Sequence, residues 1–146
     1  MSEDLGFLIG DTARLMRRAF DERVRTQGVT RPQWRVLGLL SRFGGSTQVV
    51  LAEMMDVEPI TLGRMIDRLQ EAGLVERRAD PADRRAWRIH LTAKGDACLN
   101  DLRPTALALF EDAVNGLSRS QQDELEAMLN IMRSNLIRRT PEATNG

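Results

Sequence analysis

The sequence predicts a mainly α-helical protein with one small β-hairpin near the middle of the chain. Apolar residues recur at helical spacing over long stretches before residue 73 and after residue 92. Between these stretches the period changes, and two short runs alternate apolar and polar residues as strands do. With 146 residues, 42% of them hydrophobic, the chain has the size and composition of a globular domain that buries a core.

Four helices are expected before the alternating runs. Thr30 and Gln33 have the spacing of a capping box, in which each side chain bonds a backbone N–H at a helix start. Pro59 suits the first turn of a helix, where its missing N–H costs nothing, and Gly73 is a typical helix end. The expected helices cover residues 5–26, 31–42, 47–55 and 59–72.

The two alternating runs, 74–78 and 87–91, are expected to pair as a hairpin. Trp87 and Ile89 fall on one side of the second run, and Arg88 falls on the other. The loop between the runs is polar, charged and contains turn residues, so it is expected to form a long hairpin tip.

Two further helices are expected after the hairpin. Thr92 is a suitable N-cap for the first of them, and Pro104 is expected to kink it. Ser118 and Gln121 form a second capping box at the start of the last helix. Residues 141–146 are expected to fray. The last helix has one apolar side, made of Leu125, Met128, Leu129, Met132 and Leu136.

Composition argues against several classes of protein. A single cysteine, Cys98, allows no internal disulfide, and one histidine, His90, leaves too few ligands for a structural zinc site. No nucleophile–base set or glycine-rich phosphate loop is present, so we predict no enzyme, no cofactor and no metal. No stretch approaches the roughly 20 apolar residues of a membrane span, and a cytoplasmic location is expected.

Positive charge is concentrated in the middle of the chain. The 21 basic and 21 acidic residues cancel overall. Between residues 59 and 90, however, seven arginines face only five acidic residues, whereas acidic residues outnumber basic ones after residue 92. A local excess of positive charge is where a polyanion such as nucleic acid would bind. Aromatic residues are only 4% of the chain, which argues against a protein that stacks single-stranded bases.

The order of short helix, tight turn, helix and charged hairpin is that of a winged helix-turn-helix. At about 100° per residue, the helix over 59–72 has two distinct faces. Its core face holds Leu62, Ile66, Leu69 and Gly73, and its opposite face holds Ile60, Arg64, Asp67, Arg68 and Glu71.

The exposed face of this helix has the chemistry to read a major groove. Arg64 could pair with guanine or with a phosphate, and Ile60 could contact a thymine methyl group. Thr61 could hydrogen-bond a phosphate together with first-turn N–H groups, and Arg68 extends the same face. A solvated surface helix with charges spaced by chance remains the alternative.

The hairpin tip is strongly basic, since five arginines between residues 77 and 88 are opposed only by Asp80 and Asp83. An arginine at the end of an extended loop can enter a narrow minor groove, where the potential is most negative. An aspartate two residues earlier could hold that guanidinium in a bidentate pair. The alternative is a charged hairpin that only keeps the surface soluble.

These segments resemble the MarR family of transcription regulators. The hairpin reads Leu-Val-Glu-Arg at 74–77, Asp-Pro-Ala-Asp-Arg-Arg-Ala at 80–86 and Ile-His-Leu-Thr-Ala-Lys-Gly at 89–95, which is similar to the family's wing signature. Residues 61–69 followed by Gly-Leu-Val at 73–75 resemble its recognition helix, and residues 33–37 resemble its second helix. The resemblance extends over roughly residues 5–139.

The resemblance implies a homodimer joined by the first and the last two helices, which binds a near-palindromic operator, usually as a repressor released by a small-molecule effector. It implies that Arg85 enters the minor groove, that Asp83 orients it, and that Arg64 reads the major groove. Arg84, Arg77 and Arg78 are possible phosphate contacts. Two recognition helices would then enter successive major grooves about one helical turn apart.

The predicted organisation is an N-terminal dimerisation helix (1–29), a winged helix-turn-helix core (30–91), C-terminal dimerisation helices (92–140) and a frayed tail (141–146). A physical argument favours the same dimer, because a winged core of about 60 residues does not need such long apolar helices at both ends. The alternative is that these helices pack only on their own chain.

Two other functions stay open. One is a ligand-binding or protein-interaction module that keeps this fold without binding an operator, because Pro59 and Ile60 stand where relatives often have small polar residues. The other is a redox sensor that uses Cys98, although a buried, inert thiol is favoured at this position. The sequence does not identify the residues that would bind an effector.

Overall fold

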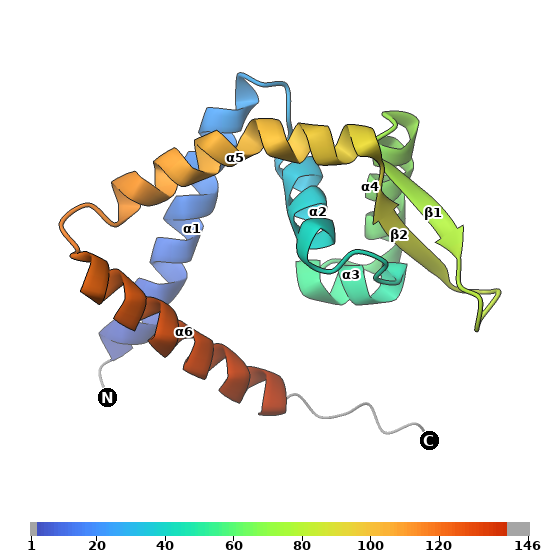
Figure 1. Cartoon of the computed structure of the whole chain (residues 1–146). Coiled ribbons are helices and arrows are strands. Elements are labelled where there is room, and N and C mark those ends of the chain that lie inside the picture. Colours follow the sequence, from blue (N-terminus) through green and yellow to red (C-terminus); the bar gives the residue numbers. More distant parts are fainter. Residues whose placement is uncertain (1–2, 140–146) are drawn as a thin grey trace. The chain divides into compact units, whose positions relative to one another are not determined.

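The protein is described here from a computed structural model that places residues 3–139; the predicted tail at 141–146 lies outside the described residues. The chain divides into two compact units, one up to Leu109 and one from Phe110 onward. Figure 1 shows α1 (Glu3–Arg25), α2 (Arg31–Arg42), α3 (Gln48–Met55), α4 (Pro59–Glu71), β1 (Val75–Ala79), β2 (Trp87–Leu91), α5 (Ala93–Ala113) and α6 (Arg119–Arg139).

The described elements confirm a mainly helical fold with a small hairpin. Every predicted helix is present, with ends within a few residues of those expected. The second strand coincides with the predicted run, and the first begins one residue later, at Val75. The helix α5 continues through Pro104, which lies inside it.

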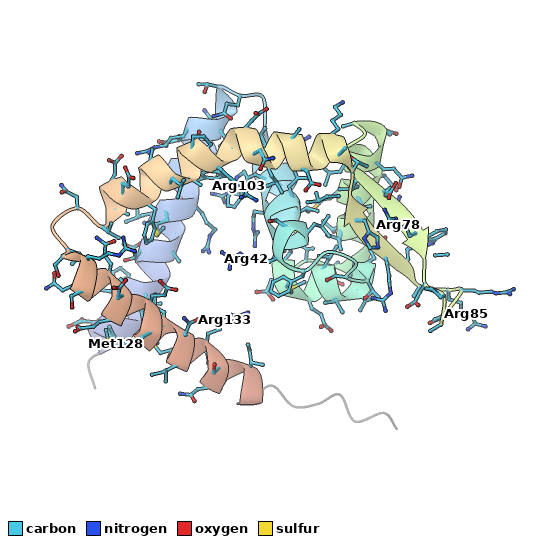
Figure 2. All side chains as sticks on the ribbon, in the orientation of Figure 1. Arg42, Arg78, Arg85, Arg103, Met128 and Arg133 are labelled. Carbon is cyan, nitrogen blue, oxygen red and sulfur yellow. The ribbon has the colours of Figure 1, made fainter. Side chains whose placement is uncertain are left out.

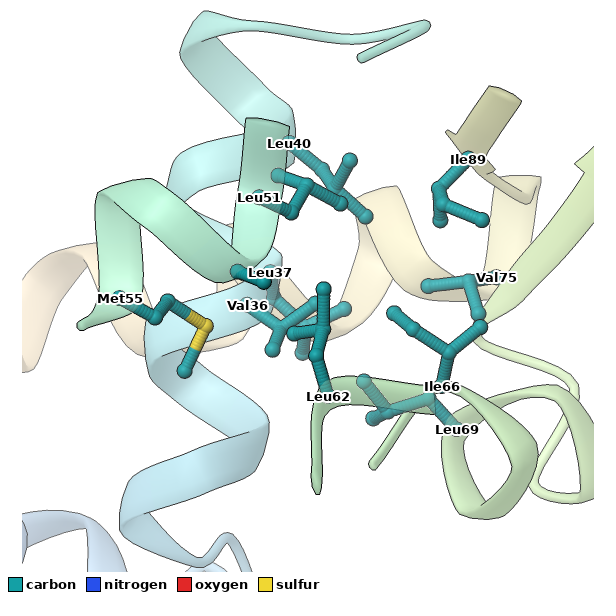
Figure 3. Packing of buried hydrophobic residues seen from close by; sticks show 11 residues of the cluster. Val36, Leu37, Leu40, Leu51, Met55, Leu62, Ile66, Leu69, Val75 and Ile89 are labelled. Carbon is teal, nitrogen blue, oxygen red and sulfur yellow. The ribbon is translucent and has the colours of Figure 1, made fainter. Parts of the chain in front are cut away.

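The core of the first unit lies between α2, α3, α4 and the hairpin (Figure 3). Leu62, Ile66 and Leu69 on the predicted inner face of α4 are almost completely buried, as expected from their helical spacing. They pack with apolar side chains from every other element of this core: Val36, Leu37, Leu40, Leu51, Ala52, Met55, Val75 and Ile89.

Polar contacts set the angle at which α2 leaves α1. The predicted capping box at Thr30 and Gln33 is present in full. Next to it, the Trp34 indole N–H donates to the Asp21 carboxylate at 2.7 Å, and Arg31 pairs with the other oxygen of the same carboxylate. The Trp34 ring meets Phe20 edge to face at 4.7 Å between centroids. The start of α2 is therefore tied to the last turns of α1.

The backbone hydrogen bonds of the hairpin extend beyond its two strands. The strands β1 and β2 pair antiparallel, with Val75 opposite Leu91 and Ala79 opposite Trp87. The outer edge of β2 also exchanges backbone hydrogen bonds with residues 45 and 46, at 2.9 and 3.0 Å, where the chain enters α3. The hairpin is thus joined to the loop between α2 and α3 by main-chain bonds.

The start of α5 packs directly on the turn between α4 and β1. Gly73 takes a left-handed conformation (φ 76°) that ends α4, and its carbonyl accepts from the Thr92 hydroxyl at 2.6 Å. Thr92 also caps α5, as predicted, by accepting from the Gly95 N–H. A Cβ on Gly95 would lie 2.1 Å from the Leu74 carbonyl oxygen, so the position requires glycine.

The second unit contains the end of α5 and α6. The predicted capping box is present, with Ser118 and Gln121 each bonding the other's backbone N–H. Within the single described chain, the predicted apolar side of α6 is exposed, from 38% at Leu125 to 68% at Leu136. Much of this face is therefore left uncovered within the described chain.

Candidate nucleic-acid interface

The core presents α4 with its predicted outer face open to solvent. Pro59 begins the helix, and Ile60 in its first turn is 74% exposed. Thr61, Arg64 and Arg68 are exposed as well, so every residue proposed for groove contact on α4 is accessible. Arg64 and Arg68, with Thr61, also border a hollow of about 310 Å³ between α4 and the start of α2.

The hairpin tip between β1 and β2 is held by two short side-chain-to-backbone turns. Asp80 accepts from the Ala82 N–H at 2.9 Å, and Asp83 accepts from the Arg85 N–H at 2.9 Å. Such bonds are typical of aspartate in turns and set the backbone path without regular secondary structure. Asp83, Arg84 and Arg85 are exposed, and Figure 2 shows Arg85 extending outward from the tip.

Asp83 contacts Arg85 differently from the predicted bidentate pair. Its carboxylate bonds the Arg85 backbone N–H, and it makes no ion pair with the Arg85 guanidinium or any other described residue. The bond orients the main chain at the tip and leaves the Arg85 side chain to point away. The charge of this guanidinium is consequently not neutralised by its neighbour.

Asp80, rather than Asp83, is the aspartate that forms an ion pair in the hairpin. Its side chain is only 10% exposed and lies 3.1 Å from the Arg88 guanidinium, which also donates to the Gly45 carbonyl at 2.8 Å. The hydrogen bond from the Ala82 N–H holds the pKa of the Asp80 carboxyl below its ordinary value, and Arg88 adds to this effect. Burial of the carboxyl acts in the opposite direction but is outweighed. Through these two contacts Arg88 connects the base of the tip to the loop before α3.

Arg77 and Arg78, on β1, are also tied to neighbours. The Arg77 guanidinium contacts α4 through the Asp67 carboxylate at 2.7 Å, the Gly63 carbonyl at 3.2 Å and the Gln70 amide oxygen at 3.1 Å. Arg78 forms an ion pair with Glu76 on its own strand. The Arg77 side chain is 19% exposed, so its contacts are turned inward, toward α4, and not toward a phosphate.

The seven arginines between residues 59 and 90 therefore fall into two groups. Three of them, at positions 77, 78 and 88, make ion pairs inside the core or hairpin. The other four make no ion pair with any residue that the structure describes: Arg64, Arg68, Arg84 and Arg85. These four are the arginines predicted as the main DNA contacts, and they come in two pairs, one on α4 and one at the hairpin tip.

Two arginines that tie the hairpin to neighbouring elements, Arg77 and Arg88, were not predicted to make these contacts. The alternation of β1 contained a signal for Arg77, since it lies two residues after Val75 and so faces the core. The pairing of Arg88 with Asp80 had no such signal, because it depends on how the tip folds back.

The remaining candidate functional residues are Cys98 and His90. Cys98 is half-buried against the hydrophobic core, and burial raises the pKa of its thiol. His90 stands opposite Glu76 in the hairpin and close to Gly45. Within residues 3–139 there is no cluster of three or more metal-binding side chains. None of the helices placed by the structure has the length and apolarity to cross a membrane.

Comparisons with known proteins agree with this geometry. A model of the MarR family matches residues 27–86, which include α2, α3, α4 and the hairpin up to its tip. A MarR transcriptional regulator from Methanosarcina mazei is 27% identical, with a TM-score of 0.82, over 94% of this chain and 99% of its own. A further solved structure, described as a transcriptional regulator, is 34% identical with a TM-score of 0.79, over 92% and 99%.

One similar structure contains DNA. It is a mutant of MarR from E. coli in complex with operator DNA, 27% identical to this chain with a TM-score of 0.73, and the match covers 89% of this chain and 94% of that one. The winged helix-turn-helix, the four unpaired arginines and these relatives agree: the chain belongs to the MarR family of DNA-binding transcription regulators.

Proposed function

We propose that this protein is a homodimeric repressor, not an enzyme, that binds a near-palindromic operator in the cytoplasm and is released by a small-molecule effector. The proposal that the protein binds DNA is supported by the four unpaired arginines, two on α4 and two at the hairpin tip. Unpaired guanidinium groups are the donors that bind phosphates and base edges.

In this proposal α4 enters the major groove and the hairpin tip enters the neighbouring minor groove. Arg64 reads guanine or binds a phosphate, Ile60 contacts a thymine methyl group, and Thr61 donates to a phosphate. Arg68 and Arg84 bind phosphates beside these contacts. Arg85 inserts into the minor groove, and Asp83 directs it through the backbone of the tip.

The dimer is supported by apolar surface that the described chain leaves uncovered. The apolar side of α6 is exposed, and so are Phe7, Leu8 and Leu15 on α1. Exposed apolar area of this extent is typical of a protein–protein interface. We propose a two-fold dimer formed by these helices and by α5, corresponding to residues 1–29 and 92–140, with the winged core 30–91 left to bind DNA.

The principal test is Arg85→Ala in a gel-shift titration. The DNA is a duplex selected by the wild-type protein from a randomised pool. We expect the affinity to fall at least about tenfold, roughly 1.4 kcal/mol, because one minor-groove contact per subunit is lost. Arg103→Ala, which removes the same charge from α5, should change the affinity by less than about twofold. Equal binding by both variants would overturn the assignment of the wing.

Arg64→Ala tests the reading of bases separately. If Arg64 recognises guanine, the variant should select sites with a relaxed base preference at one position of each half-site. The selection is repeated from the same randomised pool and sequenced. An unchanged consensus would show that Arg64 binds only the backbone.

The alternative, a module of this fold that binds no operator, makes a different prediction in the same experiments. Such a protein would select no consensus from the pool, and its sedimentation would not change when DNA is added. A repressor should sediment as one dimer per duplex, with an affinity that falls as salt rises, because the DNA-facing surface is locally basic despite the neutral net charge.

A further inference from the structure

The contacts of Arg77 connect the two parts of the proposed interface. We propose that Arg77 is a positioning residue that holds the wing at a fixed angle to α4, so that Arg64 and Arg85 bind DNA as one unit. The inference rests on the proposed function, because it assumes that both arginines contact DNA. Arg77 itself would contact no DNA.

The first observation is where Arg77 lies. It is opposite Ile89 in the hairpin, on the strand face that also carries the buried Val75. Strand alternation therefore points its side chain at α4, whereas Arg78 next to it points the other way. With 19% of its side chain exposed, Arg77 is the least exposed of the three paired arginines in this segment, Arg77, Arg78 and Arg88.

The second observation is what Arg77 binds. Gly63, Asp67 and Gln70 lie four and three residues apart, so they share one side of α4 over about two turns. The planar guanidinium reaches all three, using one terminal nitrogen for Gln70 and the other for Gly63 and Asp67. A planar group with several donors can restrain a helix against both sliding and rotation.

The third observation is that the contacted residues are next to the proposed DNA contacts. Gly63 precedes Arg64, and Asp67 precedes Arg68, so Arg77 holds the backbone on which both stand. At the other end, Arg77 is in β1, which leads within eight residues to Arg85. A single side chain thus links the helix that would enter the major groove to the strand that leads to the minor groove.

This arrangement predicts a specific loss of affinity in Arg77→Gln. The operator affinity should fall about tenfold, because a wing free to move must be ordered again on binding. Arg78→Gln is the matched control: it removes the same charge from the next residue, and because Arg78 is paired with Glu76 on its own strand, the proposed function assigns it no DNA contact. Its effect should stay below about threefold. Equal effects of the two variants would overturn the proposal.

The coupling is measured by adding Arg85→Ala to each background. In the wild-type protein this change should cost at least about tenfold, and in the Arg77→Gln variant no more than about threefold further. Fully additive losses would contradict a positioning role. The salt dependence of the affinity gives an independent check. The loss of one phosphate contact lowers the slope of log affinity against log salt concentration by about one. If this slope falls more in Arg77→Gln than in Arg78→Gln, Arg77 contacts DNA and the proposal is overturned.

A readout without DNA separates this inference from the proposed function. Hydrogen exchange of the wing amides, including those of Asp80 and Ala86, should be faster in Arg77→Gln than in Arg78→Gln. Equal exchange would overturn the inference while leaving DNA binding intact. Faster exchange in a protein that selects no DNA would instead contradict the proposed function alone.

If Arg77→Gln fails to fold, Arg77→Lys provides the same test. A lysine keeps the charge and can reach Asp67, but its single ammonium cannot span Gly63 and Gln70 as the guanidinium does. Its affinity should fall between those of the wild type and Arg77→Gln, with the same reduced effect of Arg85→Ala. Wild-type affinity with an unreduced effect of Arg85→Ala would overturn the proposal, because the contacts to Gly63 and Gln70 would then play no part in positioning the wing.

Discussion

The winged core and α6 use their apolar residues in opposite ways. In the core, Leu62, Ile66 and Leu69 of α4 are almost completely buried against other elements of the same chain. In α6, the apolar side that includes Leu129 and Leu136 remains exposed within its unit. The core therefore completes its own packing, whereas the apolar side of α6 is suited to burial against another surface.

The largest expected effect is in the core. Ile66→Ala should lower the free energy of unfolding by about 3 kcal/mol, since it removes a fully buried side chain and leaves a cavity. Ile60→Ala, on the exposed side of the same helix, should cost less than about 0.5 kcal/mol. Urea unfolding followed by circular dichroism measures both. Similar values for the two variants would show that α4 is not seated by its predicted inner face.

The next effect concerns α6 and tests whether its exposed side pairs with a second copy. Leu129→Glu places a charge in the apolar side and should convert a dimer to a monomer at micromolar concentration, with the secondary structure retained. Asn130→Glu puts the same charge on the neighbouring position, about 100° around the helix, and should remain a dimer. Sedimentation velocity distinguishes them. A Leu129→Glu protein that stays dimeric would place the interface elsewhere.

The smallest effect comes from the hairpin tip, where the described contacts are polar. Because the Ala82 N–H and Arg88 lower the pKa of Asp80 in the folded protein, these contacts of the ionised carboxylate stabilise the hairpin above about pH 4, and this stabilisation is lost as the pH falls further. The measured quantity is the ratio of the hydrogen-exchange rates of wing amides to those of α4 amides, after correction for intrinsic rates. This ratio should be higher at pH 3.5 than at pH 6. In Asp80→Asn this difference should shrink, and an unchanged difference would assign the pH dependence to other groups.

Much of the interface could be predicted from local patterns. The inner and outer faces of α4 follow from helical spacing, and the capping residues Thr30 and Ser118 mark their helix starts correctly because a cap involves only neighbouring backbone. The exposure of Arg85 follows from its place in a polar hairpin tip. Local physics determines such features, so a single sequence contains them.

The arginine pairing could not be predicted in the same way. A local count treats all seven arginines between 59 and 90 as equal charges, and the roles of Arg77 and Arg88 depend on partners at 63, 67, 70, 45 and 80. The expected pair between Asp83 and the Arg85 guanidinium was replaced by a backbone bond, because the tip turns sharply enough to bring the Arg85 N–H to the carboxylate.

The sequence by itself thus determined the order of the elements, the buried face of α4 and a basic segment with the pattern of a winged helix-turn-helix. These depend on periodicity, caps and turn residues, which act over a few positions of the chain. Only the tertiary structure decided which arginines are neutralised and which stay available, since an ion pair between α4 and β1 forms only after the two elements pack. Of the seven arginines between residues 59 and 90, four remain without such a partner among the described residues, and they form the proposed interface.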